Sequence, residues 1–279
     1  MIPKAVLTTL LGLFALGAEA GEHIDWIATD FPPAHIVSGD LAGTGILDIE
    51  TRYLTGNMPD FTHAVRHTSN IRGWALLKER DGVCVAGAID LPERRQFALY
   101  SRRPAMAILG PQVLVRRDQL ERFAPFRNAA GEIDLDALAA DGSLHAARTG
   151  DRPLGDGIEH VTSGAGQARI ASLATSGQAV TMLDKARVDY AFGYANELAY
   201  YRLVHPGSAE MTAIRIAGQP RILFTKVACS DGPVGRHAIA RIDELLGLAG
   251  TPPPYFEATG RWYDPDDFRE LSAPASWPK

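Results

Sequence analysis

The sequence contains no block of basic residues, which argues against one broad class of functions. Its 28 lysine and arginine residues are outnumbered by 33 aspartate and glutamate residues, and the formal net charge is −5. A surface that binds nucleic acid or an anionic membrane through charge requires clustered positive side chains. We therefore expect neither nucleic acid nor a charged lipid surface as a partner.

Long apolar runs are equally scarce. Beyond the N-terminus no stretch approaches the roughly 20 apolar residues that span a bilayer, and the sequence has no low-complexity segment or internal repeat of solenoid period. Hydrophobic residues make up 46% and charged residues 22% of the 279 residues. This composition and length predict a globular protein with one large domain or two of ordinary size.

The exception is the N-terminal stretch MIPKAVLTTLLGLFALGAEA. Lys4 supplies a positive charge, residues 5–16 form an apolar core, and Ala18-Glu19-Ala20 has the small-x-small pattern that signal peptidase cuts after. We predict a cleavable signal peptide that ends at Ala20 and leaves 259 of the 279 residues. The residue at the cleavage point is Gly21 and not a cysteine, so a soluble exported protein is expected rather than a lipid-anchored one.

Cysteine is rare, with only Cys84 and Cys229 present. In an oxidising, exported setting an isolated pair predicts one disulfide. Closing the 145 residues that separate the two cysteines would contribute about 5 kcal/mol in the ideal chain-entropy description. The alternative is a pair of buried free thiols.

Hydrophobic periodicity in the first part of the chain predicts strands alternating with helices. Strands are expected at residues 23–31, 61–68 and 83–89, and helices at 46–54 and 71–80, the second with Asn70 as N-cap. This order predicts a largely parallel sheet with helices on its faces.

A second α/β unit is expected beyond Pro104. Its predicted elements are an extended run at 105–115 interrupted by Gly110-Pro111, helices at 135–140, 178–185 and 196–203, and strands at 144–148, near His160 and Val161, and at 190–192. The chain then returns with a strand at 221–228, a helix at 235–248 and an aromatic tail.

Four stretches of this chain follow one another in a familiar order. They are DFPPAHIVSGDLAGTGILDIETRYL (30–54), GVCVAGAIDLPERRQFALYSRRP (82–104), ARVDYAFGYANELAYY (186–201) and ILFTKVACSDGPVGRHAIARIDELL (222–246). The first stretch is an aromatic-and-proline strand end, and the second contains an arginine followed by F-x-x-x-S-x-x-P. The third is a basic-hydrophobic-acidic strand, and the fourth is a return strand with its helix. In this order they resemble the family 3 extracellular solute-binding proteins, the periplasmic partners of amino-acid import systems.

The resemblance implies the type II periplasmic binding fold, in which two lobes, each a mainly parallel sheet flanked by helices, are joined by two hinge strands. Residues 21–108 and 216–279 would form lobe 1, residues 109–215 would form lobe 2, and the hinges would fall near 105–111 and 212–219. Both cysteines would then lie in lobe 1, where they can pair. The family precedent implies a monomer.

The resemblance also implies site residues in lobe 1. Phe31 matches the aromatic residue that packs on the ligand, and Arg94 matches the arginine that grips the ligand carboxylate with a planar fork of donors. The adjacent Arg95 leaves two registers open. The loop before this arginine lacks the family's serines, so Gly87 and Ala88 would contribute backbone amides.

In lobe 2, Tyr194 takes the place of the acidic residue that holds a ligand ammonium, which argues against an ordinary α-amino acid as ligand. Arg148 and Thr149 end a predicted strand where a helix N-terminus binds an anion; a solvated loop is the alternative. His63 and His67 would lie about 13 Å apart on a strand, too far to share a metal. No metal, cofactor or catalytic residue is expected.

We therefore expect a periplasmic receptor that closes over a small polar or anionic ligand and delivers it to an ABC-type permease. Two alternatives remain open. One is an exported enzyme on the same fold, resembling the cyclohexadienyl dehydratases, with Asp90, Glu93 or Glu197 as an acid of raised pKa. The other is a ligand-sensing subunit whose kinase or cyclase partner is a separate chain.

Overall fold

The computed structural model describes residues 21–150, 152–163 and 169–278. The predicted signal peptide lies outside these described residues. Within them, no helix combines the length and the apolar character required to cross a bilayer.

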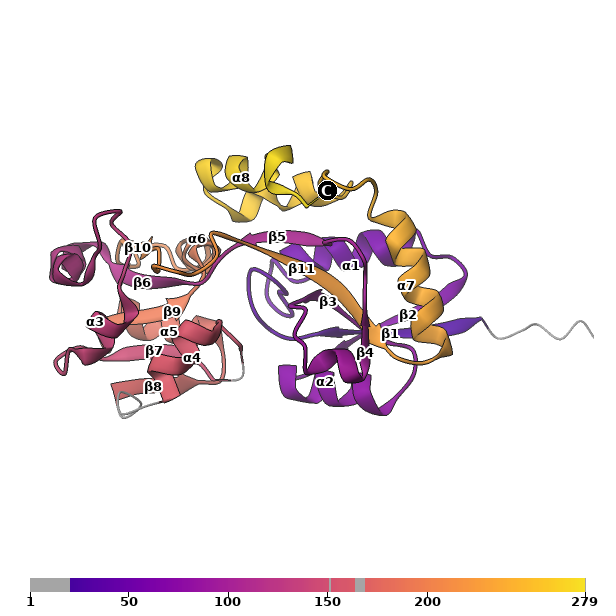
Figure 1. The fold of residues 1–279 in the computed structure, drawn as a ribbon, viewed down its shortest axis with the longest axis horizontal. Coiled ribbons are helices and arrows are strands. Elements are labelled where there is room, and N and C mark those ends of the chain that lie inside the picture. The colour runs from indigo at the N-terminus through magenta and orange to yellow at the C-terminus, as the bar shows by residue number, and fades with distance from the viewer. Residues whose placement is uncertain (1–20, 151, 164–168, 279) are drawn as a thin grey trace, which may run out of the picture.

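Two β-sheets, each flanked by helices, form two lobes that lie side by side (Figure 1). The first sheet has the strand order β2-β1-β3-β11-β4, and β5 pairs with β11 beyond it. Its strands are β1 (Glu22–Ala28), β2 (Phe61–His67), β3 (Val83–Ala88), β4 (Ala98–Tyr100), β5 (Met106–Leu109) and β11 (Ile222–Ser230). Strands β1, β2 and β3 are parallel, as the alternation with helices predicts, whereas the returning β11 is antiparallel to β3, β4 and β5.

The second sheet has the strand order β10-β6-β9-β7-β8. Its strands are β6 (Gln112–Arg116), β7 (Ala146–Thr149), β8 (Ile170–Leu173), β9 (Tyr190–Gly193) and β10 (Met211–Ile214). Strands β7, β8 and β9 are parallel, while β6 and β10 are antiparallel to their neighbours. Each sheet therefore has a parallel part to which antiparallel strands are added.

Most of the described helices flank these sheets, whereas α8 (Pro265–Ser272) lies beside β5, between the lobes (Figure 1). The α-helices are α1 (Ile46–Gly56), α2 (Asn70–Glu79), α3 (Leu135–Ala140), α4 (Asp156–Ser163), α5 (Ser176–Asp184), α6 (Ala195–Val204), α7 (Pro233–Leu245) and α8 (Pro265–Ser272). The 3-10 helices are Arg94–Gln96, Arg117–Phe126, Phe256–Trp262 and Pro274–Ser276.

Two local predictions are wrong. His160 and Val161 lie in helix α4 rather than in a strand, because Ile158 and Thr162, four residues apart, turn to the buried face of a helix. The N-cap of α2 is Ser69, whose hydroxyl accepts a hydrogen bond from the Arg72 amide at 3.3 Å.

Apolar residues from distant parts of the chain share one core in the first lobe. Trp26 of β1, Ile242 of α7 and Trp262 near the C-terminus are each at most 1% exposed and belong to the same cluster. Burial of such large side chains is worth about 1.5–3 kcal/mol each. The C-terminal part of the chain is therefore integral to the lobe that the N-terminal part begins.

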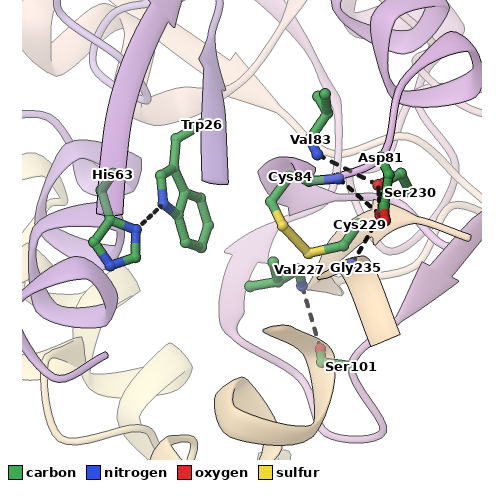
Figure 2. The surroundings of a disulfide bond; sticks show 11 residues. Trp26, His63, Asp81, Val83, Cys84, Ser101, Val227, Cys229, Ser230 and Gly235 are labelled. Carbon is green, nitrogen blue, oxygen red and sulfur yellow. Dashed lines mark hydrogen bonds between the residues drawn. A yellow bond between two sulfur atoms is a disulfide. The ribbon is translucent and has the colours of Figure 1, made fainter. Parts of the chain in front are cut away.

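The predicted disulfide is confirmed. Cys84 of β3 and Cys229 of β11 are directly opposite each other in the antiparallel pair, and their sulfur atoms are bonded (Figure 2). Neither cysteine is exposed. The bond ties the returning strand to the N-terminal part of the same lobe.

The β5–β11 pair extends from the first sheet toward the second (Figure 1). At its end the amide of Gly110 donates to the Arg221 carbonyl at 2.9 Å. A Cβ atom at Gly110 would lie 1.9 Å from the Pro220 oxygen, so only glycine permits the two connecting segments to approach this closely. The hinges near 105–111 and 212–219 and the lobe boundaries at 108/109 and 215/216 stay a prediction.

Candidate functional site

A cavity of about 110 Å³ lies where the two lobes meet. Its wall is formed by the ends of β1 and β3, the loop before α1, helix α2, strands β5 and β11, and the segment after β7. The lining residues used below are Phe31, Trp74, Gly87, Ala88, Arg94, Arg152, Tyr194 and Thr225. Five of the predicted site residues, Phe31, Gly87, Ala88, Arg94 and Tyr194, are therefore brought together.

Arg94 carries the positive charge of the first lobe's wall. Its guanidinium carbon lies 3.8 Å from the centroid of the Trp74 ring, a stacked geometry that fixes the plane of the guanidinium. Trp74 is itself held by a 3.2 Å hydrogen bond from its indole N–H to the Asn70 side chain. Burial lowers the pKa of Arg94, yet an arginine remains charged at neutral pH.

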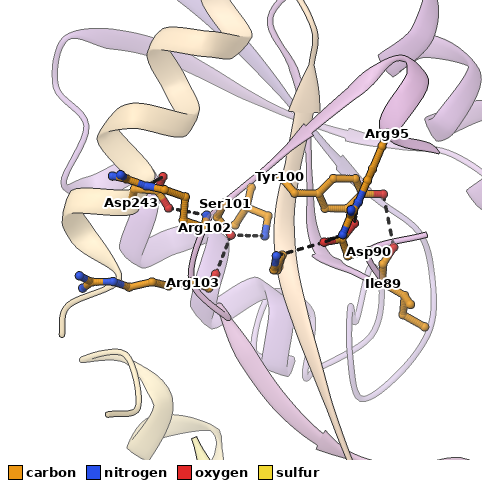
Figure 3. A network of polar contacts seen from close by, with 10 residues as sticks. Ile89, Asp90, Arg95, Tyr100, Ser101, Arg102, Arg103 and Asp243 are labelled. Carbon is orange, nitrogen blue, oxygen red and sulfur yellow. Dashed lines mark hydrogen bonds and ion pairs between the residues drawn. The ribbon is translucent and has the colours of Figure 1, made fainter. Parts of the chain in front are cut away.

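The structure distinguishes Arg94 from Arg95. Arg95 does not line the cavity, is exposed, and binds Asp90 through two hydrogen bonds of 2.7 and 2.9 Å (Figure 3). Lys226 approaches the same carboxylate at 3.0 Å. Among the described residues, no carboxylate is within ion-pair distance of Arg94, so its guanidinium remains able to bind an anion.

Glycine is required at the end of β3. Gly87 has a φ of 65°, in the left-handed region, and an added Cβ atom would lie 2.6 Å from the Leu47 side chain. Because Gly87 has no side chain, the backbone at Gly87 and Ala88 can form part of the cavity wall. This geometry suits recognition by backbone groups, as the sequence predicts for this loop.

Phe31 and Tyr194 come from opposite lobes and face the same group. The guanidinium carbon of Arg152 lies 5.0 Å from the centroid of the Phe31 ring and 4.3 Å from that of Tyr194. Arg152 also forms an ion pair with Glu197. Sequence reasoning missed Arg152, and it selected Arg148 and Thr149, a few residues earlier on the same segment.

Arg148 and Thr149 are not among the cavity-lining residues. The Arg148 guanidinium binds both carboxylate oxygens of Glu159 in α4, at 2.8 and 2.9 Å, and the Thr162 hydroxyl at 2.6 Å. Thr149 is 3% exposed within β7. The charge of Arg148 is therefore paired inside the second lobe, the structure does not bring Arg148 and Thr149 to the cavity, and an anion site at the end of β7 stays a prediction.

A smaller cavity of about 60 Å³ shares Arg152, Tyr194 and Thr225 with the first. Tyr263, from the C-terminal tail, contributes to its wall. The Thr225 hydroxyl is buried and has no hydrogen-bond partner among the described residues. An unpaired buried hydroxyl is costly, so this group is a candidate contact for a polar ligand atom.

A larger groove of about 1000 Å³ adjoins these cavities and shares Ile89, Pro153 and Tyr194 with the first. Acidic residues of the second lobe, including Asp134, Asp136 and Asp156, border it. We regard the cavity of about 110 Å³ as the candidate binding site because Arg94, which has no ion-pair partner among the described residues, and the aromatic rings of Phe31 and Tyr194 converge there.

Two of the three residues considered for acid catalysis, Asp90 and Glu197, have other partners. Hydrogen bonding to Arg95, with Lys226 nearby, holds the pKa of Asp90 below its usual range, opposite to what a general acid needs. Glu197 is paired with Arg152, and Glu93 borders the larger groove. The described part of the chain contains no group of three or more histidine, cysteine or acidic residues placed to hold a metal ion.

No protein-family model and no curated protein sequence matches this chain. Solved structures do match it. A histidine kinase sensor domain with similarity to periplasmic binding proteins is 18% identical, with 89% of this chain and 94% of that chain covered and a TM-score of 0.57. A Salmonella typhimurium periplasmic binding protein with high arginine specificity is 14% identical (87% and 100% covered, TM-score 0.60).

The GluR0 ligand-binding core in complex with L-glutamate is 13% identical (92% and 100% covered, TM-score 0.59). At such low identity the likeness establishes the fold alone. The chain has the two-lobed fold of the periplasmic binding proteins, as the sequence predicts.

Proposed function

We propose that this protein is an extracytoplasmic binding protein that captures a small carboxylate between its two lobes. The observation that supports this proposal is Arg94, a half-buried guanidinium in the wall of an interlobe cavity with no carboxylate partner among the described residues. Phe31 and Tyr194 reach the same cavity from opposite lobes. The structural neighbours include proteins whose names describe arginine and glutamate binding.

Binding would act by shifting the equilibrium between open and closed lobes. A ligand held by Arg94 on one lobe and by groups of the other lobe is bound more tightly in the closed form, and only this difference in affinity can move the equilibrium. The β5–β11 pair and the segment at Gly110 would bend as the lobes close.

The first test compares Arg94→Ala with Arg95→Ala, a matched control one residue away that lies outside the cavity. A panel of small carboxylates is screened by thermal shift, and hits are measured by isothermal titration calorimetry. Loss of charge-assisted hydrogen bonds worth about 1.5–3 kcal/mol should weaken binding roughly 10- to 100-fold in Arg94→Ala, while Arg95→Ala should match the parent. Equal affinity of Arg94→Ala and the parent would reject the assignment.

We further propose export through the N-terminal signal peptide and presentation of the closed form to a membrane partner. The structural neighbours include both an ABC transporter substrate-binding protein and a histidine kinase sensor domain, so an importer and a sensor kinase are the two partners to test. Co-purification of tagged, ligand-bound protein from membranes, followed by identification of the captured permease or kinase, distinguishes them. Intact mass of the secreted chain tests cleavage after Ala20.

A further inference from the structure

The protein itself supplies the cation that lies between Phe31 and Tyr194. Arg152 stacks against both rings and pairs with Glu197; the Arg152 side chain is 17% exposed and that of Glu197 is 5% exposed. Two aromatic faces and a buried carboxylate are the chemistry that holds an organic cation. Phe31, Tyr194 and Glu197 therefore form a cation site, which Arg152 fills.

Glu197 is fixed in this arrangement. One of its oxygens accepts a hydrogen bond from the Tyr194 amide at 3.2 Å, at the start of α6. The same oxygen would be 2.5 Å from a Cβ atom at Gly193, so it packs directly against the strand backbone. The carboxylate is held behind Arg152 and does not line either cavity.

The wall that a ligand would meet is consequently positive. Arg94 and Arg152 both line the cavity, whereas no aspartate or glutamate of the described residues does. His35, also in the wall, is hydrogen-bonded at 2.7 Å to Asp48, which lies outside the lining. A ligand ammonium would lose its water there, face two guanidinium groups and find no carboxylate, which is a strong penalty.

We infer that Arg152 takes the place of a ligand cation, so that the cavity selects small organic acids without an ammonium group over the matching α-amino acids. The inference rests on the proposed capture of a carboxylate at Arg94 and adds the class of ligand. α-Hydroxy acids fit best, because their hydroxyl can exchange a hydrogen bond with the unpartnered Thr225 hydroxyl at the junction of the two cavities.

The test uses pairs of L-compounds that differ only by hydroxyl in place of ammonium: lactate and alanine, 2-hydroxyglutarate and glutamate, 2-hydroxyisocaproate and leucine, phenyllactate and phenylalanine. Affinities are measured by calorimetry for the parent, for Arg152→Ala and for Arg187→Ala, an exposed arginine of the same lobe that lines neither cavity. The parent and Arg187→Ala should bind a hydroxy acid at least tenfold more tightly than its amino acid. Arg152→Ala should reverse this preference, because Glu197 and the two rings become available to the ammonium.

A second readout does not depend on carboxylate binding. Methylguanidinium at millimolar concentration should raise the melting temperature of Arg152→Ala by several degrees, because it refills the vacated site. It should leave the parent and Arg187→Ala unchanged. If Arg152→Ala does not fold, the hydroxy-acid preference of the parent decides the inference.

Tighter binding of the amino acid by the parent would overturn the inference and leave the proposed binding function intact. Folded Arg152→Ala that shows neither a reversed preference nor stabilisation by methylguanidinium would also overturn it. Failure of the parent to bind any of these compounds or any other carboxylate would contradict the proposed function itself, together with the ligand class inferred from it.

Discussion

At the scale of single residues, Glu50 shows how a buried carboxyl group limits stability as the pH rises. It lies in α1, is fully buried, and neither carboxylate oxygen has a well-formed hydrogen bond among the described residues. Burial raises the pKa of Glu50 from 4.5 to about 8, and the nearby Gly87 amide offsets this only in part. The residue lies beneath the loop that brings Gly87 into the cavity wall.

This raised pKa predicts a stability that falls with pH. Well below pH 4.5, Glu50 is protonated whether the chain is folded or not. Between pH 4.5 and about 8 the unfolded chain releases the proton and the folded protein retains it, so unfolding becomes easier by up to about 1.4 kcal/mol per pH unit. Above the folded pKa this loss levels off.

Glu50→Gln should therefore unfold at a higher denaturant concentration than the parent near pH 8, with the difference shrinking toward pH 4.5. The exposed Glu121→Gln serves as control, and urea unfolding at several pH values provides the measurement. A constant difference between Glu50→Gln and the parent over this range would contradict the assignment.

The sequence predicts the residues of the first lobe's wall better than those of the second. Arg94 follows a recognisable loop, and the strand end at Phe31 is marked by two prolines. Arg152 has no such signal, because its position depends on how the chain turns after β7 and on Glu197, 45 residues later. Tyr263 was missed because only the folded C-terminal tail brings it beside α6.

At the scale of elements, the contact between the two connecting segments depends on Gly110. Replacing Gly110 by alanine would force the Cβ atom against the Pro220 carbonyl and separate the segments, since the two atoms cannot be 1.9 Å apart. We expect a loss of about 1–3 kcal/mol in stability. Gly177→Ala, in a helix with open space around it, should be neutral or slightly stabilising.

Chemical denaturation of both alanine variants measures this difference. Equal unfolding midpoints for Gly110→Ala and Gly177→Ala would show that the contact between the segments at Gly110 and Pro220 does not require glycine. A Gly110→Ala protein that is folded but binds its carboxylate ligand weakly would instead indicate that this contact takes part in closure of the lobes.

The disulfide joins two neighbouring strands of one lobe, β3 and β11. Replacing both Cys84 and Cys229 by alanine should lower the free energy of unfolding by about 2–5 kcal/mol, because the 145-residue loop regains its freedom in the unfolded chain. Ligand affinity should stay within about threefold of the parent, since the cavity contains neither cysteine. Unchanged stability by urea unfolding would contradict this account.

Many elements follow from periodicity, whereas helix α4 and strand β8 are examples of elements that do not, for physical reasons. The ring of His160 and the β-branched Val161 locally favour a strand. The burial of Ile158 and Thr162, four residues apart, selects helix α4 instead. Strand β8 has only partly buried or exposed side chains and so gives no apolar signal. The antiparallel course of β11 depends on the return of the chain, which local patterns do not encode.

At the scale of the whole molecule, the C-terminal tail contacts both lobes. The Trp262 indole donates to the Thr44 carbonyl of the first lobe at 2.9 Å, and its ring lies 5.9 Å from that of Tyr200 in α6 of the second. Arg202 of the same helix is 3.5 Å from Asp264. The proposed closure of the lobes would therefore occur with this tail in contact with both of them.

Small-angle X-ray scattering of the mature protein, with and without a carboxylate that binds in calorimetry, tests the central claim most directly. We expect the radius of gyration to decrease on saturation in the parent and in Arg95→Ala, with no decrease in Arg94→Ala at the same ligand concentration. Superimposable scattering curves for the free and the saturated parent would contradict capture by closure of two lobes.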